Sequence, residues 1–342
     1  MRKISKQDLK LICRLDRRWK PEIIQVKRLG GQTNRNFVVT YREPFGLPRG
    51  KAGKLRVKKF FVRLPWERED VVDRANEGKN ILAMARNKKL RRILPKYRLY
   101  ILKRKNSLAP ASKEHFDVPD GTIVSEFLEG SELTMRHFRQ RRYQRALAKT
   151  LAAFHGSGVR FVNPYNVFQD EIRKYRLKAM RHSLSKFFSK GTLTELLVIE
   201  KEAEQRLQET PLGISSHNDI IFQNILVSKN GMLRLLDFEY AGLNEKGGIF
   251  YDLGFAFRDS FFNPPQMSQE VFERFLSVAD KAYKKKLDRS QIYWAVIAAL
   301  LVGIWWGILR YFDASKQEKA YFQIYVQRGV LGVLSLHSLI SK

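Results

Sequence analysis

The feature that most constrains the fold is a hairpin signal in the second half of the chain. Two runs, NILV at residues 224–227 and MLRLLDF at residues 232–238, flank the dipeptide Asn230-Gly231. Both residues of such a pair tolerate positive φ, so the pair predicts a two-residue turn between antiparallel strands. The register of that turn places Asn224 opposite Asp237. Opposite side chains have Cβ atoms about 4.5–5.5 Å apart, which predicts that an amide and a carboxylate can share one cation.

Two further polar residues precede the hairpin. Asp219 lies five residues before Asn224, and His217 lies two residues before Asp219. Phosphoryl transfer uses one carboxylate to orient the attacking hydroxyl, and an amide and a second carboxylate to hold Mg²⁺ on the nucleotide phosphates. The spacing H-x-D-x-x-x-x-N, followed by an Asp at the end of an apolar strand, therefore predicts a kinase site. The alternatives are an ordinary polar hairpin, and a His217 that only braces the loop.

The organisation of the chain predicts an α+β protein of two unequal lobes. Residues 22–64 contain β-branched and aromatic runs typical of strands, whereas residues 131–342 are mainly helical in their apolar spacing. We predict an N-terminal nucleotide-binding lobe at 1–124, a hinge at 125–130, and a C-terminal catalytic and substrate-binding lobe at 131–342.

The charge of the chain predicts attraction to anions. There are 64 Lys and Arg residues against 34 Asp and Glu, a formal net charge of +30. Nucleotides, RNA and an anionic membrane surface are the candidate partners, and a merely solvated surface is the alternative. The basic clusters are not gathered on one helix with interleaved aromatics, so we expect peripheral attraction to anionic membranes but no specific nucleic acid partner.

Two features bear on the compartment. The chain has a single cysteine, Cys13, and its first residues include no apolar signal region. We therefore expect a cytoplasmic protein. Residues 290–309 carry no charge over 20 positions, which by length alone is a candidate membrane span. We predict instead a buried helix of the large lobe, because no second span accompanies it.

The motifs around the hairpin resemble those of the choline/ethanolamine kinase family, within the superfamily that includes aminoglycoside phosphotransferases. The segments that carry the resemblance are HNDIIFQN and LLDFEYAGLN, with LGGQTNRNF, FFVRLPW, ANEGKN, VSEFLEG and YDLGFAFRD elsewhere. They span most of the chain. The resemblance implies a bilobal protein-kinase-like fold, with a small antiparallel-sheet N-lobe and a larger, mostly helical C-lobe. It also implies an enzyme that uses ATP and Mg²⁺.

The resemblance assigns roles to individual positions. Asp219 would be the catalytic base, and Asn224 and Asp237 would bind Mg²⁺. Residues expected to bind the nucleotide are Gly31, Thr33 and Asn34 in a phosphate turn, Arg63 paired with Glu77, and the main chain of Glu126, Phe127 and Leu128. Arg63 also has a physical argument, because a charge on an apolar strand needs a buried partner or a ligand.

The acceptor implied by the resemblance is an amino alcohol, with choline first. A quaternary ammonium is recognised by aromatic faces and a carboxylate. The candidate substrate residues are Glu239, Tyr240, Asp259, Trp306 and Tyr325. Gly303 departs from the family, which often has tryptophan there. Ethanolamine, thiamine and aminoglycosides are the alternative acceptors, and a catalytically inactive basic binding module is the alternative from another class.

Overall fold

The chain forms two compact units in the computed structural model. The structure describes residues 4–15, 23–29, 34–43, 56–65, 73–101, 118–262 and 267–341. The first unit is Met1–Gly130 with Arg234–Glu239, and the second is Ser131–Leu233 with Tyr240–Lys342. The sequence prediction placed residues 234–239 in the second lobe. They group with the first unit because Arg234 Nη1 donates hydrogen bonds to the carbonyls of Arg91 and Leu94.

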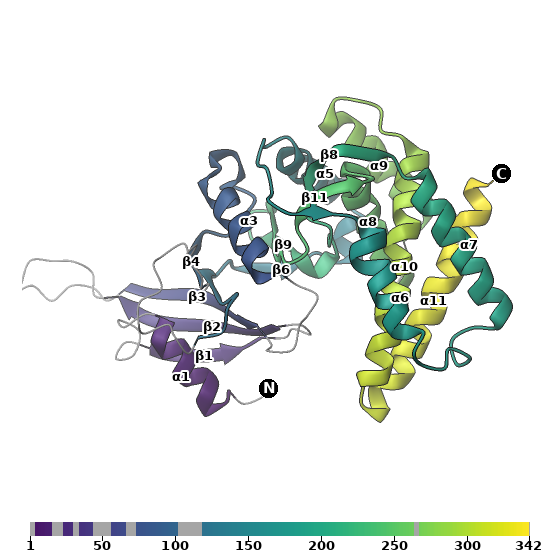
Figure 1. The fold of residues 1–342 in the computed structure, drawn as a ribbon. Helices are drawn as coiled ribbons and strands as arrows, with labels where there is room; N and C mark the ends of the chain where they lie inside the picture. The colour runs from purple at the N-terminus through teal and green to yellow at the C-terminus, as the bar shows by residue number, and fades with distance from the viewer. Residues whose placement is uncertain are drawn as a thin grey trace, which may run out of the picture. The chain divides into compact units, whose positions relative to one another are not determined.

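Five antiparallel strands form the sheet in the described part of the first unit (Figure 1). In sheet order the strands are β1 (Ile23–Arg28), β2 (Asn34–Glu43), β3 (Arg56–Pro65), β5 (Ile123–Glu126) and β4 (Tyr97–Tyr100). The accompanying helices are α1 (Lys6–Leu15), α3 (Arg74–Arg86) and the 3₁₀ turn η1 (Lys88–Leu90). Helix α3 begins after Asp73, whose Oδ1 accepts hydrogen bonds from the N–H groups of Ala75 and Asn76.

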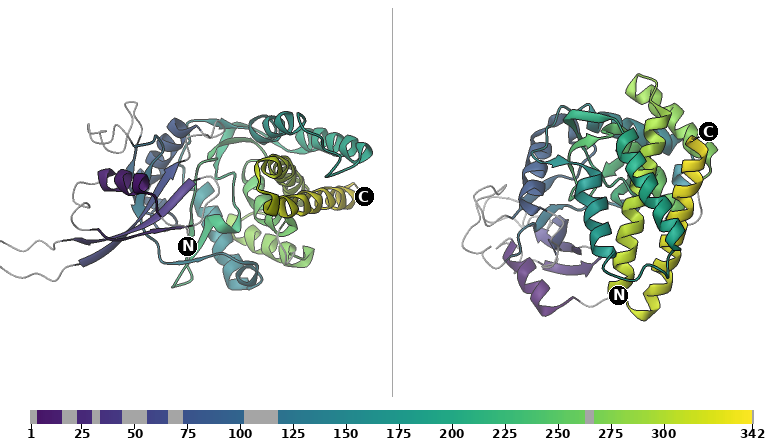
Figure 2. Two further views of the ribbon diagram at one scale, coloured as in Figure 1. Left: turned by 90° about the horizontal axis from the view of Figure 1, so that it is seen from below. Right: turned by 45° about the vertical axis from the view of Figure 1, so that its right-hand side comes forward.

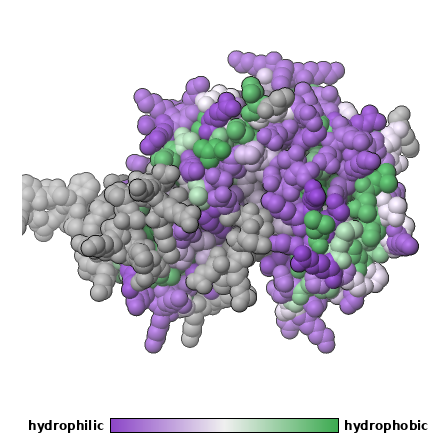
Figure 3. Space-filling view, in the orientation of Figure 1, coloured by the Kyte–Doolittle hydropathy of each residue, from purple (hydrophilic) through white to green (hydrophobic). Residues whose placement is uncertain are grey.

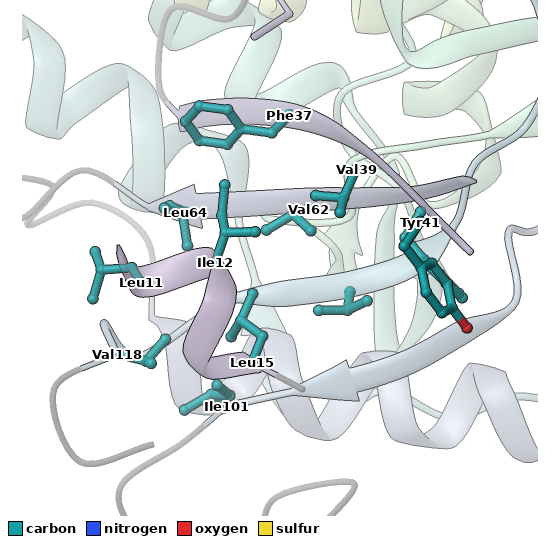
Figure 4. Close-up of a cluster of buried hydrophobic side chains, with 12 residues drawn as sticks. Leu11, Ile12, Leu15, Phe37, Val39, Tyr41, Val62, Leu64, Ile101 and Val118 are labelled. Atoms are coloured by element: carbon teal, nitrogen blue, oxygen red, sulfur yellow. The ribbon is translucent and has the colours of Figure 1, made fainter. Parts of the chain in front are cut away.

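The core of the first unit lies between α1 and one face of this sheet (Figure 4). Alternate strand residues enter it, as the two-residue period of a strand requires. The cluster comprises Leu11, Ile12, Leu15, Phe37, Val39, Tyr41, Phe60, Val62, Leu64, Ile101, Val118 and Val124. Burying one such side chain contributes about 1.5–3 kcal/mol. Because Val62 and Leu64 face α1, the intervening Arg63 lies on the opposite face of the sheet.

Helices make up most of the second unit. They are α4 (Met135–Phe138), α5 (Arg141–His155), the π-helix η3 (Phe168–Ile172), α6 (Arg173–Ala179), α7 (Lys190–Arg206), α8 (Ile249–Phe262), α9 (Gln269–Tyr283), α10 (Arg289–Asp313) and α11 (Lys316–Ile340). Helix α10 packs against both α8 and α11, and the views in Figure 2 show α10 and α11 side by side. This arrangement brings the aromatic residues of three helices together.

Helix α10 contains the uncharged segment. Within the described ranges it is the one helix long and apolar enough to cross a membrane, and 89% of its most apolar window is buried inside the protein. That burial agrees with the predicted core helix. The described surface on the face drawn in Figure 3 is mainly hydrophilic, with hydrophobic side chains in small groups.

The remaining strands are short. They are β6 (Gly130–Glu132), β7 (Pro164–Tyr165), β8 (Glu209–Ser216), β9 (Ile225–Ser228), β10 (Leu233–Leu235) and β11 (Gly242–Lys246). They belong to the second unit, except that Gly130 of β6 and the last two residues of β10 belong to the first. Strand β11 lies between β7 and β8 and pairs Gly242 with Ser216, the last residue of β8. The catalytic-loop sequence starts at the residue after this pair.

The predicted hairpin forms between β9 and β10, but its register differs from the prediction. The Ser228 N–H donates to the Met232 carbonyl at 2.9 Å, and the Gly231 N–H donates to the Ser228 carbonyl at 2.8 Å. Gly231 has a φ of 77°, so the connection is a three-residue turn ending in a bulge. The extra residue shifts the register by one, and Asn224 lies in the 3₁₀ turn η4 (Phe222–Asn224). The prediction that Asn224 pairs with Asp237 across the strands was therefore wrong.

Candidate active site

The main chain of the catalytic loop is held by one buried carboxylate. Asp252, in the first turn of α8, accepts hydrogen bonds from the N–H groups of His217 at 2.9 Å and Asn218 at 2.8 Å. Asn218 has a φ of 64°, a conformation that asparagine tolerates better than most residues. Its side chain donates to the Tyr240 carbonyl and accepts from Asn244 Nδ2. The loop conformation is thus fixed by contacts distant in sequence.

A histidine completes the support of Asp252. His155 Nε2 lies 2.9 Å from Asp252 Oδ2, and its Nδ1 lies 2.6 Å from the Tyr283 hydroxyl. Burial alone would raise the pKa of Asp252, but the contacts with His155 and the main chain hold that pKa below its usual value. Asp252 is therefore a carboxylate acceptor for the loop, a role that sequence reasoning did not assign to it.

Asn224 orients the predicted catalytic base. Its Nδ2 donates to Asp219 Oδ2 at 2.8 Å and to the Asp219 carbonyl at 3.0 Å. The Asp219 N–H in turn donates to His217 Nδ1 at 3.3 Å, which agrees with a bracing role for His217. Since Nδ2 makes both contacts with Asp219, the amide oxygen of Asn224 is the atom that could ligate a cation.

Arg63 lies at the centre of a charged cluster in the first unit. Its Nη2 donates to Glu77 Oε1 at 2.6 Å, which is the predicted pair, and its Nη1 donates to Asp237 Oδ1 at 3.0 Å. The Arg63 and Glu77 side chains are 4% and 0% exposed, so neither charge is solvated. Each charge therefore depends on its protein partners.

Arg74 is a second arginine of this cluster that sequence reasoning missed. Its Nη1 donates to Glu77 Oε2 at 3.0 Å and to Glu239 Oε2 at 3.1 Å. Glu239 also accepts from Asn34 Nδ2 at 3.1 Å. The sequence signal that could have identified Arg74 is its i, i+3 spacing from Glu77 on a helix. The structure thus gives Glu239, a predicted substrate residue, an ion pair within the first unit.

The predicted phosphate turn is described in part. Asn34 is buried at the start of β2 and joins the Arg74 and Glu239 contacts. Gly31 and Thr33 lie outside the described residues. Their nucleotide-binding roles stay predictions.

The hinge residues contribute main-chain groups to the sheet. The Glu126 N–H donates to the Lys96 carbonyl at 3.0 Å, and the Phe127 N–H donates to the Lys59 carbonyl at 3.3 Å. These two amides are therefore occupied. The Leu128 amide and the carbonyls of this segment are the groups that could meet an adenine, and their role stays a prediction.

The predicted substrate residues of the second unit fall mainly around α8, α10 and α11. The rings of Trp306 and Tyr325 have centroids 5.9 Å apart, and Asp259 is close enough to Tyr325 to act on it electrostatically. Tyr240 is attached instead to the catalytic loop through its carbonyl. Arg258, which sequence reasoning missed, lies beside Tyr325 and donates to its hydroxyl at 3.0 Å.

A match to a protein-family model shows to which known enzymes this chain is related. The model of the family "Choline/ethanolamine kinase" matches residues 102–274, about half of the chain. The chain belongs to the choline/ethanolamine kinase family. That match includes the catalytic loop and Asp252, whereas Arg63, Trp306 and Tyr325 lie outside it.

Individual relatives agree with the family. Human ethanolamine kinase 2 is 26% identical over 258 residues, which cover 73% of this chain and 57% of that protein. Choline kinase LicA from Streptococcus pneumoniae gives a TM-score of 0.66 at 20% identity, covering 96% of this chain and all of LicA, and it has also been solved with AMP. Ethanolamine kinase from Plasmodium vivax gives a TM-score of 0.63 at 14% identity, covering 97% and 89% of the two chains. The structural likenesses establish a choline kinase-like fold.

The first-unit cluster contains one more carboxylate than guanidinium groups. Three carboxylates, Glu77, Asp237 and Glu239, face two guanidinium groups. Burial and the neighbouring Glu239 raise the pKa of Asp237 to about 7, although Arg63 opposes this. The Asp237 side chain is 32% exposed. Asp237 is the carboxylate of this cluster most accessible to a ligand, but the described residues contain no group of three or more Asp, Glu, His or Cys side chains arranged to hold a metal ion.

A separate buried carboxylate gives this family member a pH-dependent stability. Glu171 of η3 accepts a hydrogen bond from the Tyr165 hydroxyl, and burial raises its pKa to about 7. The unfolded chain releases this proton near pH 4.5, whereas the folded protein keeps it until about pH 7. The contribution of Glu171 is therefore fully present below pH 4.5 and is lost as the pH rises to 7, at a cost of about 3 kcal/mol.

We expect Glu171→Gln to remove this loss, because an amide accepts the Tyr165 hydrogen bond without ionising. Denaturant unfolding at pH 5 and pH 7.5 should show that the variant gains stability over the wild type only at the higher pH. The exposed Glu195→Gln serves as the matched control. If wild type and Glu171→Gln had parallel pH profiles, ionisation of Glu171 would not limit the stability.

Proposed function

We propose that this protein is a small-molecule kinase that transfers the γ-phosphate of ATP to a hydroxyl group of a small alcohol. The observation that carries the proposal is the Asp219 carboxylate, which is held by Asn224 in a loop braced by Asp252. A base for phosphoryl transfer must be fixed in direction and accessible, and Asp219 is oriented by an amide and only half-buried. Family membership supports the same reaction class.

Each residue of the site would have its own role in the phosphoryl transfer. Asp219 would accept the hydrogen bond of the acceptor hydroxyl and take its proton as the bond to phosphorus forms. Asn224 and Asp237 would be the protein ligands of Mg²⁺. The ion, when bound, would neutralise charge on the phosphates. Arg63 would keep Asp237 and Glu77 in place from its buried position, and we propose that it also faces the nucleotide phosphates.

The catalytically inactive alternative has little support. The set that chemistry requires, Asp219, Asn224 and Asp237, is complete, and the loop that carries two of its members is fully braced. Cytoplasmic location and peripheral attraction to anionic membranes stay predictions from composition.

The chemical class of the acceptor alcohol can also be proposed. Choline and ethanolamine are the acceptors in the family name, and choline was the first prediction from the sequence. The neighbouring rings of Trp306 and Tyr325, with Asp259 nearby, support an acceptor that carries an amino group. The same region also contains Arg258, whose positive charge bears on the choice of acceptor.

The test is ATP consumption across a panel of small alcohols that includes choline, ethanolamine, thiamine and an aminoglycoside. We expect consumption to need both an alcohol and Mg²⁺, and to stop when EDTA is added. Phosphorylated product should form in equal amount to ADP. ATP hydrolysis that is independent of every alcohol, or no consumption at all, would contradict the proposal.

A further inference from the structure

Arg258 occupies an aromatic enclosure in the second unit. Its guanidinium carbon lies 4.6 Å from the ring centroid of Phe262 and 5.2 Å from that of Phe255. Phe262 in turn stacks on Tyr325, with centroids 4.0 Å apart. Arg258 is 8% exposed. A cation is therefore already present among the rings that would have to receive a quaternary ammonium group.

Arg258 makes no direct ion pair in the described ranges, although Asp259 and Asp219 act on it at longer range and raise its pKa. Its Nε donates to the Ala299 carbonyl at 3.3 Å, and its Nη2 donates to the Tyr325 hydroxyl at 3.0 Å, so both acceptors are uncharged. Within the described ranges, no Asp or Glu oxygen lies within 4.0 Å of its nitrogens, and its Nη1 makes no hydrogen bond. A guanidinium has five donors in a planar fork, so Arg258 has donors on Nη1 that could bind a ligand.

Gly303 of α10 provides the space for this arrangement. A Cβ at Gly303 would lie 2.5 Å from Arg258 Nη2 and 2.4 Å from the Phe262 ring. Any side chain at position 303 would therefore displace the guanidinium or the ring. The position of Arg258 depends on the absence of a side chain at 303, the same position at which the chain departs from its family.

Arg258 also interacts electrostatically with the predicted catalytic base. The Asp219 carboxylate acts electrostatically on both Arg258 and Tyr325. All of these residues belong to the second unit, so this relation does not depend on the first. A group bound by Arg258 would thus belong to the acceptor whose hydroxyl meets Asp219.

We propose that Arg258 determines acceptor specificity, and that it selects alcohols carrying a carboxylate while excluding a quaternary ammonium from the aromatic enclosure. A planar guanidinium binds a carboxylate through two parallel hydrogen bonds, whereas it repels a like charge. This inference rests on the proposed kinase function and narrows its acceptor class. An amino alcohol with a carboxylate satisfies both Arg258 and the nearby Asp259.

The experiment compares alcohols that differ only by a carboxylate. Ethanolamine is paired with L-serine, and ethylene glycol is paired with glycerate, with choline added as the quaternary ammonium. We expect the wild type to have a higher kcat/KM for the carboxylate-bearing member of at least one pair. Arg258→Met should lower that kcat/KM by about 10- to 100-fold and remove the preference, while the KM for ATP stays the same.

Matched variants separate recognition from folding. Arg258→Lys keeps the charge but loses the fork, so it should retain part of the preference. Arg274→Met is the control, since Arg274 likewise donates to an amide oxygen and a carbonyl but lies on α9. Should Arg258→Met unfold, the comparison rests on Arg258→Lys, together with protection of the wild type against thermal unfolding by L-serine and glycerate in the absence of ATP.

Different results would overturn the inference about Arg258 and the kinase proposal. The inference is overturned if the wild type uses choline or ethanolamine better than every carboxylate-bearing alcohol, or if the preference survives in Arg258→Met. It is also overturned if neither L-serine nor glycerate is used or protects the wild type. Failure of all alcohols to be phosphorylated would contradict the kinase proposal instead, and the protection measurement would still decide whether Arg258 binds carboxylates.

Discussion

Asp219→Ala is expected to lower kcat by about 10²–10⁴-fold with the best acceptor of the panel, because the acceptor hydroxyl loses its general base. The KM for ATP should change little, since Asp219 is proposed to meet the acceptor. The variant should fold, because Asp219 is half-buried and its main-chain contacts with His217 and Asn224 do not need the carboxylate. Steady-state rates of ADP formation measure the effect.

The control for this change is Glu195→Ala, which removes an exposed carboxylate from α7 of the same unit. It should leave kcat and both KM values unaltered. Asp219→Asn should be nearly as inactive as Asp219→Ala, because an amide keeps the hydrogen bond geometry but accepts no proton. A turnover within a few-fold of wild type in either Asp219 variant would remove the assigned base.

Arg63→Met is expected to destabilise the first unit by about 3–5 kcal/mol, because it leaves buried carboxylates without their main partner. Glu77, Asp237 and Glu239 would then share Arg74 alone. Burial would raise the pKa of Glu77, but Arg63 and Arg74 hold it below its usual value. In the wild type, the stability from this carboxylate is present above pH 4.5, its ordinary pKa, and is lost only at lower pH. In Arg63→Met, burial would instead raise the pKa of Glu77, so that protonation relieves more of the cost at pH 5 than at pH 8. The destabilisation by Arg63→Met should therefore be greater at pH 8 than at pH 5.

The same strand offers a matched control. Lys59 of β3 pairs with Glu129 at 3.3 Å, but both side chains are almost half exposed. Lys59→Met should cost at most about 1 kcal/mol, as exposed ion pairs do. The double variant Arg63→Met with Glu77→Leu should be less destabilised than the sum of its single changes. Equal effects of Arg63→Met and Lys59→Met in denaturant unfolding would show that the buried cluster contributes little.

The sequence alone predicted those parts of the protein whose structure depends on residues close together in the chain. The strand alternation around Val62 and Leu64 identified the sheet of the first unit, and the Asn230-Gly231 pair identified the hairpin. The catalytic loop could be identified because Asp219 and Asn224 are five residues apart and contact each other directly. The apolar run of α10 indicated either a buried helix or a membrane span, and its burial inside the protein agrees with the first.

Tertiary structure decided what depends on partners distant in sequence. Whether the hairpin contained a bulge followed from the conformation of Gly231, which the dipeptide alone did not fix. The brace of the catalytic loop needs His155 and Asp252, 97 residues apart, and no local pattern links them. In the sequence, nothing distinguishes Arg258 from the other basic residues of a chain whose formal net charge is +30. Only the packing of α8 against α10 and α11 shows that Arg258 is buried, lies among aromatic rings and donates to the Tyr325 hydroxyl, because burial and pairing are set by contacts that sequence neighbours do not make.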